Sequence, residues 1–144
     1  MREEIQIRSA VSDDADGLFL LSQFFESTAT KEHLQKSISE NDDEIVCVAC
    51  DSSKIVGYCT GLIVKSMFYR DNRVDVEQFF VKPEYRKQGI GKALLSCVEA
   101  EAVSKGIHHF HLSTGSTNIA AQTLYHKLGY ADTGEILMDK TIES

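Results

Sequence analysis

The sequence contains no long apolar run and no apolar N-terminal segment. Its 144 residues include no stretch of about 18 apolar residues, the length that a membrane-spanning helix needs, so we expect no membrane partner. The first nine residues, MREEIQIRS, lack the apolar core of a secretion signal. On this basis we expect a soluble, cytoplasmic protein.

Basic residues are also scarce. The 15 Lys and Arg are outnumbered by 22 Asp and Glu, which gives a net charge of −7. Binding to a nucleic-acid backbone needs a basic surface, so we expect no nucleic-acid partner. The imbalance is local, because residues 1–44 hold 11 acidic and 4 basic residues whereas residues 45–144 hold 11 of each. The whole acidic excess therefore lies in the first third.

Proline is nearly absent, and no segment has the composition of a linker. Pro83 is the single proline, and we find neither a low-complexity tract nor an internal repeat. With 42% hydrophobic residues and the length of one ordinary domain, the chain can form one sizeable core. We therefore predict a single domain over residues 1–144.

Cysteine is too rare for a zinc ribbon. Cys47 and Cys50 form the only C-x-x-C pair, and a ribbon needs two such pairs. The surrounding EIVCVACD is typical of a strand, on which positions three apart point to opposite faces. We interpret all four cysteines as free thiols, most of them in the core.

The histidines give a weak metal signal. His109 and His111 would share a face of a strand, a spacing that could seat a metal. No Asp, Glu or Cys lies close by in sequence to complete a ligand set, so we interpret both as half-buried strand residues and expect no metal.

Periodicity predicts the order of elements. A strand surrounds Ile5 and Ile7, and Ser12 then has the position of an N-cap. The first helix carries Leu18, Leu21 and Phe25 on one face. A second helix is predicted from Thr30 to about Glu40.

The remaining elements alternate between strands and helices. Short polar links between the next three strands favour an antiparallel meander. Together the elements give βααβββαβαβ, an α/β (α+β) fold with a mixed, mostly antiparallel sheet flanked by helices. The predicted ranges are strands at 44–50, 55–65, 73–81, 107–112 and 135–142, and helices at 89–104 and 117–128.

The strand at 73–81 shows a break in its alternation. Val74 and Val76 share one parity, while Phe79 and Val81 share the other. The apolar face thus slips by one residue near Glu77-Gln78, as it does at a β-bulge.

The segment Val81–Leu95, VKPEYRKQGIGKALL, is typical of an anion-binding loop. Gly89 and Gly91 stand where the next helix begins, and the first turn of a helix leaves N–H groups without partners. Glycine lets a ligand approach the backbone closely. The loop is locally +3, with one acid, Glu84, against four bases, which are Lys82, Arg86, Lys87 and Lys92.

Two common nucleotide motifs do not fit this loop. Gly91-Lys92 is followed by Ala93 with no glycine at position 86, which excludes a P-loop. Leu94 stands in place of the third glycine of a dinucleotide fingerprint. A plain turn with exposed bases stays the simpler alternative.

Two blocks resemble a known family. Arg86-Lys87-Gln88-Gly89-Ile90-Gly91 resembles the R/Q-x-x-G-x-G/A signature of the GNAT superfamily, the acetyl-CoA-dependent N-acetyltransferases. The segment from Asn118 to Tyr130 resembles its N-x-x-A-x-x-L-Y-x-x-x-G-F/Y block. The predicted order of elements is similar to the family fold over nearly the whole chain.

The resemblance implies acetyl-CoA as cosubstrate, without a metal. In the family, the pyrophosphate of CoA lies on the signature loop, and the pantetheine arm enters a gap beside the bulged strand. Backbone groups of Phe79 and Val81 would contact the arm. The other cofactor-binding residues would be Arg86, Lys87, Gln88, Gly89, Ile90, Gly91, Lys92 and Asn118.

The resemblance also implies two catalytic residues. Tyr125 matches the family tyrosine that is often assigned as general acid towards the leaving thiolate, although its place on an apolar helix face also fits core packing. Glu77 is the candidate base for the acceptor ammonium, directly or through a water, and Asp75 is the reserve. A solvated strand carboxylate is the alternative for Glu77.

These residues predict direct acetyl transfer onto a primary amine. The acidic first third contains the two helices that flank the acceptor cleft in the family, which favours a small cationic amine, with a protein or peptide amine also compatible. A homodimer is compatible with the family as well. The alternatives are a non-catalytic acyl-CoA-binding sensor or interaction module, and a phosphate-binding domain for another nucleotide.

Overall fold

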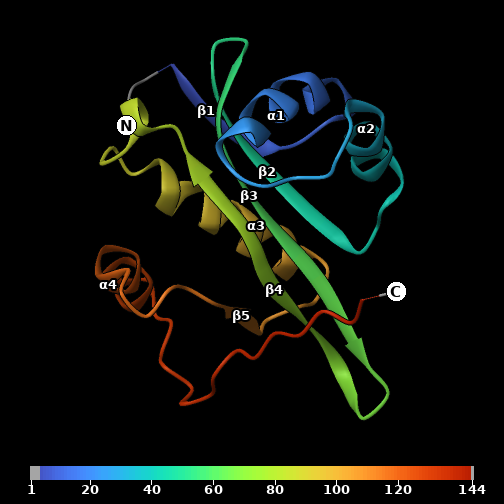
Figure 1. The fold of residues 1–144 in the computed structure, drawn as a ribbon, viewed down its shortest axis with the longest axis vertical. Coiled ribbons are helices and arrows are strands. Elements are labelled where there is room, and N and C mark those ends of the chain that lie inside the picture. The colour runs from blue at the N-terminus through green and yellow to red at the C-terminus, as the bar shows by residue number, and fades with distance from the viewer. Residues whose placement is uncertain (1–3, 144) are drawn as a thin grey trace. The chain divides into compact units, whose positions relative to one another are not determined.

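The structure is a computed structural model that describes residues 4–143 (Figure 1). The described chain forms two compact units that divide after Leu112. Only α4 among the helices and strands lies in the second unit. The elements are β1 (Ile5–Ser9), η1 (Ser12–Asp14), α1 (Ala15–Leu21), η2 (Ser22–Phe24), α2 (Lys31–Glu40), β2 (Glu44–Asp51), β3 (Lys54–Ser66), β4 (Tyr69–Val81), η3 (Pro83–Tyr85), α3 (Ile90–Ser104), β5 (Phe110–Leu112) and α4 (Ile119–Lys127).

The first unit is built on one mixed sheet. Its strand order is β1-β2-β3-β4-β5. The first four strands pair antiparallel, and β5 pairs parallel with β4. The α/β (α+β) fold class and the antiparallel meander of β2, β3 and β4 are thus confirmed.

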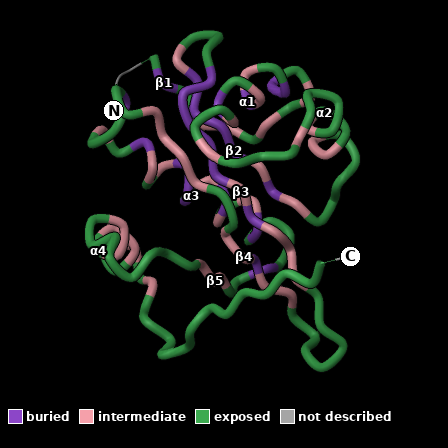
Figure 2. The backbone as a smooth tube through the Cα atoms, viewed as in Figure 1, coloured by how far each residue is buried: buried purple, intermediate pink, exposed green. Residues whose placement is uncertain are grey.

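Helices cover both faces of this sheet. On one face, Val48 and Tyr58 pack with Leu18 and Leu21 of α1 in a buried cluster. On the other face, a Cβ added to Gly57 would lie 3.3 Å from Leu94 of α3. Figure 2 shows that the buried residues concentrate in the central strands and in α3.

The helix start at Ser12 is different from the prediction. Ser12 is the first residue of the 3-10 turn η1, and Val11 is its N-cap. Asp14, the last residue of η1, accepts a 2.8 Å hydrogen bond on its Oδ2 from the Val11 N–H. Asp14 also accepts two hydrogen bonds from the Arg8 guanidinium, at 2.7 and 2.9 Å. The buried carboxylate thus bonds back to the N-cap residue and to β1, and neither η1 nor α1 has a side-chain cap.

Replacing Asp14 with alanine is expected to lower the free energy of unfolding at neutral pH by about 2 kcal/mol, since a charged, largely buried hydrogen-bond acceptor is lost. The hydrogen bonds from Arg8 hold the pKa of Asp14 below its ordinary value. A depressed folded pKa means that the stabilisation is present above the unfolded pKa and is lost as pH falls through the folded one. Urea unfolding across an acid pH series measures this. A difference between the two proteins that stayed constant on the acid side would contradict it.

The second helix agrees closely with the prediction. The Oγ1 of Thr30 accepts a 3.1 Å hydrogen bond from the His33 N–H and caps α2, which ends at Glu40. The capping residue Thr30 and a sparse apolar stripe of Leu34 and Ile38, which pack against the core cluster, define this element.

The predicted bulge is present in β4. The register runs from Gly61↔Val76 to Cys59↔Phe79, so β4 gains one residue relative to β3 between these pairs. The Gln78 N–H donates a 3.1 Å hydrogen bond to the Thr60 Oγ1. The Thr60 hydroxyl thus accepts the hydrogen bond of an N–H group that has no backbone acceptor on β3 at the bulge.

The predicted last strand, Glu135–Ile142, is wrong, since no strand is formed after α4 in the described residues. Gly134 turns the chain at φ +80°, and Ile136, Leu137 and Met138 are each more than 80% exposed. These three apolar residues are consecutive rather than alternating. A strand also needs a hydrogen-bonded neighbour, which a pattern within one segment cannot supply.

Candidate active site

The anion-binding loop forms a backbone cradle at the start of α3. Lys87 has φ +62°, and Gly89, the N-cap residue, has φ +82°. The hydrogen bond from the Ala93 N–H to the Gly89 carbonyl, at 3.1 Å, opens the helix, so the preceding N–H groups of the first turn have no acceptor within the helix. A Cβ added to Gly89 would meet nothing within 4 Å. This open space beside N–H donors suits a pyrophosphate.

Two side chains hold the segment that precedes the anion-binding loop in place. The buried Tyr85 donates a 2.6 Å hydrogen bond from its hydroxyl to Asp51 Oδ2 at the end of β2. The Nε of Arg86 donates to the Val81 carbonyl at 2.8 Å, and its guanidinium lies 5.6 Å from the centroid of the Phe80 ring. Arg86 therefore ties the loop to β4, in addition to its predicted role towards phosphate.

Gly91, the second glycine of the loop, has a role in packing. A Cβ on Gly91 would lie 3.3 Å from two ring atoms of Phe79. Gly91 thus lets the first turn of α3 lie directly against β4. The other predicted loop residues surround the turn, with Lys87 and Lys92 exposed and Gln88 half-buried, whereas Ile90 is buried in the core.

The edge of β4 continues this cradle. The Lys82 N–H donates to the Val56 carbonyl at 2.9 Å, towards β3. Because backbone groups alternate in direction along a strand, those of Phe79 and Val81 point away from β3. The strand β5 pairs with β4 only as far as Val76↔Leu112. After the bulge, this edge of β4 is therefore no longer paired with β5. It is the edge from which Phe79 and Val81 are predicted to contact the pantetheine arm.

The second unit contains the other two predicted residues. The Oδ1 of Asn118 accepts a 3.1 Å hydrogen bond from the Ala121 N–H and caps α4, which leaves its amide nitrogen as a donor. Tyr125 lies half-buried on α4, and its ring meets that of Tyr130 edge-on at 6.2 Å. Both residues are described within their own unit, and their roles stay predictions.

The candidate base and its reserve have different surroundings. Glu77 is exposed at the bulge. Asp75 is held by Arg73, whose Nε donates a 2.9 Å hydrogen bond to the Asp75 Oδ1. His111 Nδ1 approaches the same oxygen at 3.9 Å, and His109 lies against His111. Sequence reasoning considered this histidine pair only for metal binding and missed its acidic neighbour, which comes from another strand.

The cysteines are free thiols and mostly buried. Burial raises the pKa of Cys47 and Cys50, and it raises that of Cys59 to about 12. A thiol that stays protonated at neutral pH is a poor nucleophile. This argues against Cys47, Cys50 and Cys59 as the site of a covalent acyl intermediate.

Within residues 4–143, no three His, Cys, Asp or Glu side chains are grouped so that they could hold a metal ion. No helix of that range is long and apolar enough to cross a membrane.

Some acids of the first third are paired with bases from the same region or from β3. Asp14 pairs with Arg8 at 2.7 Å, and Lys65 reaches Asp43 at 3.0 Å. The contact between Lys31 and Asp16, at 3.8 Å, is longer and exposed. Other acids of this region are exposed, namely Asp13, Glu26, Glu32 and Asp42.

Comparison with known proteins identifies the family. Residues 12–130 match the acetyltransferase (GNAT) family. Since this match covers most of the chain, the protein belongs to the GNAT acetyltransferase family.

Two curated relatives illustrate the similarity. Human N-acetyltransferase 8 is 35% identical over 88 residues, which are 61% of this chain and 39% of the relative. The thialysine N-epsilon-acetyltransferase of Sus scrofa is 37% identical over 83 residues, which are 58% of this chain and 48% of the relative. The matched parts are thus less than half the length of these relatives.

Solved structures share the fold. An aminoglycoside acetyltransferase from an uncultured soil metagenomic sample, in complex with trehalose, superposes with a TM-score of 0.86 at 21% identity, covering 97% of both chains. The aminoglycoside acetyltransferase AAC(6')-Iy, in complex with the bisubstrate analog CoA-S-monomethyl-acetylneamine, has a TM-score of 0.81 at 20% identity, covering 96% of this chain and 98% of that one. At these identities the likeness concerns the fold.

Proposed function

We propose that the chain transfers the acetyl group of acetyl-CoA directly onto a primary amine. The observation that carries this proposal is the cradle before α3, with positive-φ Gly89, open space beside it and first-turn N–H groups, next to an edge of β4 whose backbone points outwards. This arrangement suits a pyrophosphate that continues into an extended amide arm, as in CoA. Membership of the GNAT family supports the same cosubstrate.

The proposed roles follow from the positions of the side chains. The loop N–H groups, with Lys87 and Lys92, bind the pyrophosphate. Backbone groups of Phe79 and the N–H of Val81 bind the pantetheine arm, since the Val81 carbonyl accepts from Arg86. These contacts orient the thioester for attack by the amine. The other cofactor contacts come from Arg86 and Asn118.

Two further residues concern the reaction itself. Glu77, exposed at the bulge, attracts the acceptor ammonium and takes its proton directly or through a water. Tyr125 donates a hydrogen bond or a proton to the departing sulfur.

We propose that residues 1–144 act as one N-acetyltransferase domain, because the family match runs from residue 12 to residue 130 and so includes parts of both compact units.

The proposed acceptor is a small cationic amine. The exposed acids of the first third favour a cation in their neighbourhood. Two of the similar proteins have names that point to amines of this kind, thialysine in one case and an aminoglycoside in the other. A protein or peptide amine stays the second class of acceptor.

Release of CoA from acetyl-CoA in the presence of an amine panel tests this function. The panel should contain polyamines, lysine-like diamines, aminoglycosides, free amino acids and a lysine peptide. We expect turnover with at least one cationic small amine, and we expect kcat/KM to fall about threefold between low and physiological salt, because screening weakens the attraction of a cation.

Two outcomes would favour other functions. Binding of acetyl-CoA without turnover across the panel would indicate a sensor or interaction module. Thermal stabilisation by ATP or NAD but not by CoA would indicate a different nucleotide. A kcat/KM that stays flat across the salt range would contradict the cationic preference alone.

A further inference from the structure

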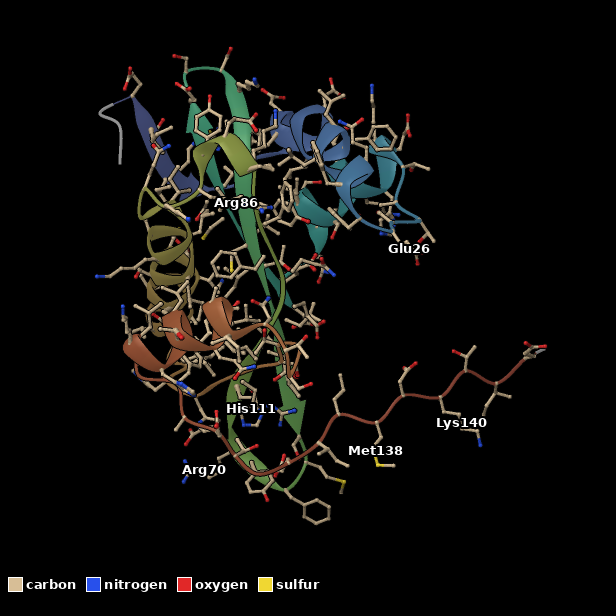
Figure 3. All side chains as sticks on the ribbon, turned by 60° about the vertical axis from the view of Figure 1, so that its left-hand side comes forward. Glu26, Arg70, Arg86, His111, Met138 and Lys140 are labelled. Carbon is tan, nitrogen blue, oxygen red and sulfur yellow. The ribbon has the colours of Figure 1, made fainter. Side chains whose placement is uncertain are left out.

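Several polar side chains lie close together near the point where the pairing of β5 with β4 ends. Asp75 of β4 and His111 of β5 are register partners, and the His111 Nδ1 lies 3.9 Å from the Asp75 Oδ1. Arg73 donates a 2.9 Å hydrogen bond from its Nε to this same oxygen. Arg73 thus holds the Asp75 carboxylate, and this carboxylate faces the Nδ1 side of the His111 imidazole. His111 is labelled in Figure 3.

His109 occupies the other side of the His111 ring. The two Nε2 atoms lie 3.0 Å apart, and the rings meet edge-on with centroids 4.8 Å apart. A nitrogen–nitrogen contact this short needs one N–H donor and one lone-pair acceptor. The two rings therefore share a proton. Assigned from its partners, His111 carries its own proton on Nδ1, towards Asp75, and accepts from His109.

This cluster lies on the sheet face opposite α3. A Cβ on Gly61 would contact both Val74 of β4 and Val98 of α3, so Val74 points towards α3. Alternation along the strand then places Asp75 on the other face, and Glu77 lies two residues further on, in the bulge that follows Val76.

His111 shares that face, because it is the register partner of Asp75 in a parallel pair. The pairing of β4 with β5 ends one residue later, at Val76↔Leu112. The imidazoles thus stand at the closed end of the gap between the strands, on the face that carries Asp75, with Glu77 two residues further along β4. His109 is exposed, so the pair also has access to water.

We propose that the His109–His111 pair, in place of Glu77, is the base that receives the proton of the acceptor amine, with Asp75 as a positioning residue. This inference rests on the proposed acetyl transfer. Glu77 then holds the ammonium. The pair takes up the proton on the ring nitrogen of His109 that does not face His111, and the shared proton moves across to His111. The resulting imidazolium is stabilised by the Asp75 carboxylate.

The proton balance of the reaction leaves one proton for this pair. The ammonium loses one proton, and its nitrogen lone pair forms the C–N bond to the acetyl carbon. The C–S bond breaks, and its electron pair stays on sulfur. The second proton that the nitrogen releases balances the one that the thiolate gains from Tyr125. The net proton leaves through His109 to water.

An imidazole suits this task because its ordinary pKa of about 6.5 lies close to neutral pH. Within the described chain, β4 is the strand that pairs with β5. The charged groups of β4 close to His111 are Asp75 and Arg73, which binds Asp75, and Glu77 follows at the bulge.

The test compares three histidine-to-glutamine variants of the full chain. For His111→Gln and His109→Gln we expect kcat/KM for the best amine to fall at least about tenfold at neutral pH. We also expect the decline in rate on the acid side, which an imidazole base produces, to disappear. His108→Gln is the matched control, since His108 is exposed and lies outside β5. It should keep the profile of the unchanged protein, and the Kd for acetyl-CoA should be the same in all three.

A positioning role for Asp75 has its own readout. Asp75→Asn removes the negative charge beside the imidazolium, so the acid decline should move to lower pH. This variant also keeps the proposal testable if His111→Gln fails to fold.

Several results would overturn the proposal. An unchanged pH profile in both His109→Gln and His111→Gln would show that the pair is not the base, while acetyl transfer would still stand. Loss of the acid decline in Glu77→Gln, with retention in the histidine variants, would assign the base to the carboxylate. If the unchanged protein released no CoA with any amine, the proposed function would fail and this inference with it.

Discussion

Replacing Tyr125 with phenylalanine is expected to lower kcat by about 10²-fold, while the Kd for acetyl-CoA stays the same. The thiolate that leaves from the thioester is the conjugate base of a thiol with a pKa of about 8.5, so a nearby phenol can hydrogen-bond to it or protonate it as it forms. This contact is stronger in the transition state than in the ground state, because the sulfur gains charge only as the C–S bond breaks. Its loss therefore affects kcat rather than binding.

The chain offers a matched control for Tyr125. Tyr130 meets Tyr125 edge-on with ring centroids 6.2 Å apart, and the family block accepts Phe or Tyr at its position. Tyr130→Phe removes the same kind of hydroxyl from the same unit. It should leave kcat within about twofold of the unchanged protein, as is usual for substitutions away from the reacting atoms. Steady-state rates and calorimetric titration with acetyl-CoA measure both quantities. A loss of less than about threefold in Tyr125→Phe would argue against the acid role.

Features of the site that depend on neighbouring residues were predictable from the sequence. The slip in apolar parity between Val76 and Phe79 predicted the bulge of β4, because side-chain alternation within one strand reports its register directly. The glycines of the loop predicted a turn into a helix, and Gly89 indeed takes a left-handed conformation. Each of these signals is contained in a few consecutive residues.

Features that depend on a partner from elsewhere in the chain were not predictable. Ser12 is not the N-cap of the helix, and the neighbouring Asp14 bonds to Arg8 of β1 and to the Val11 N–H, so the local pattern alone carries no sign of that arginine. His111 meets Asp75 because β5 lies parallel to β4 in one particular register. The absence of a strand after α4 is of the same kind, since strand formation depends on a hydrogen-bonded neighbour as well as on composition.

Introducing a negative charge at Gly89 is expected to weaken CoA binding about 100-fold. Gly89 has φ +82°, a conformation that aspartate and asparagine tolerate better than other side chains. A Cβ there would meet no other atom within 4 Å, so the new side chain occupies the open space proposed for the pyrophosphate. A unit charge about 5 Å from a phosphate, at an effective dielectric constant near 20, repels it by about 3 kcal/mol. This corresponds to roughly a 100-fold rise in the Kd of Gly89→Asp.

Two control variants separate charge, shape and backbone strain. Gly89→Asn has nearly the same shape without the charge, and it should weaken binding by no more than about tenfold. Gly106 lies just beyond the end of α3, has φ +81° and also has open space around its Cβ. Gly106→Asp thus carries a similar backbone strain far from the loop along α3, and it should retain CoA affinity.

The ionic-strength dependence of CoA binding completes this prediction. If the repulsion at position 89 is electrostatic, the gap in Kd between Gly89→Asp and Gly89→Asn should narrow as salt rises, because the screening length falls to about 3 Å at 1 M salt. Isothermal titration with CoA at low and high salt measures this. Equal affinities for the two variants at low salt would show that no phosphate lies beside Gly89. Lys87 and Lys92 would then be ordinary surface bases, and the cradle at the start of α3 would be only a turn.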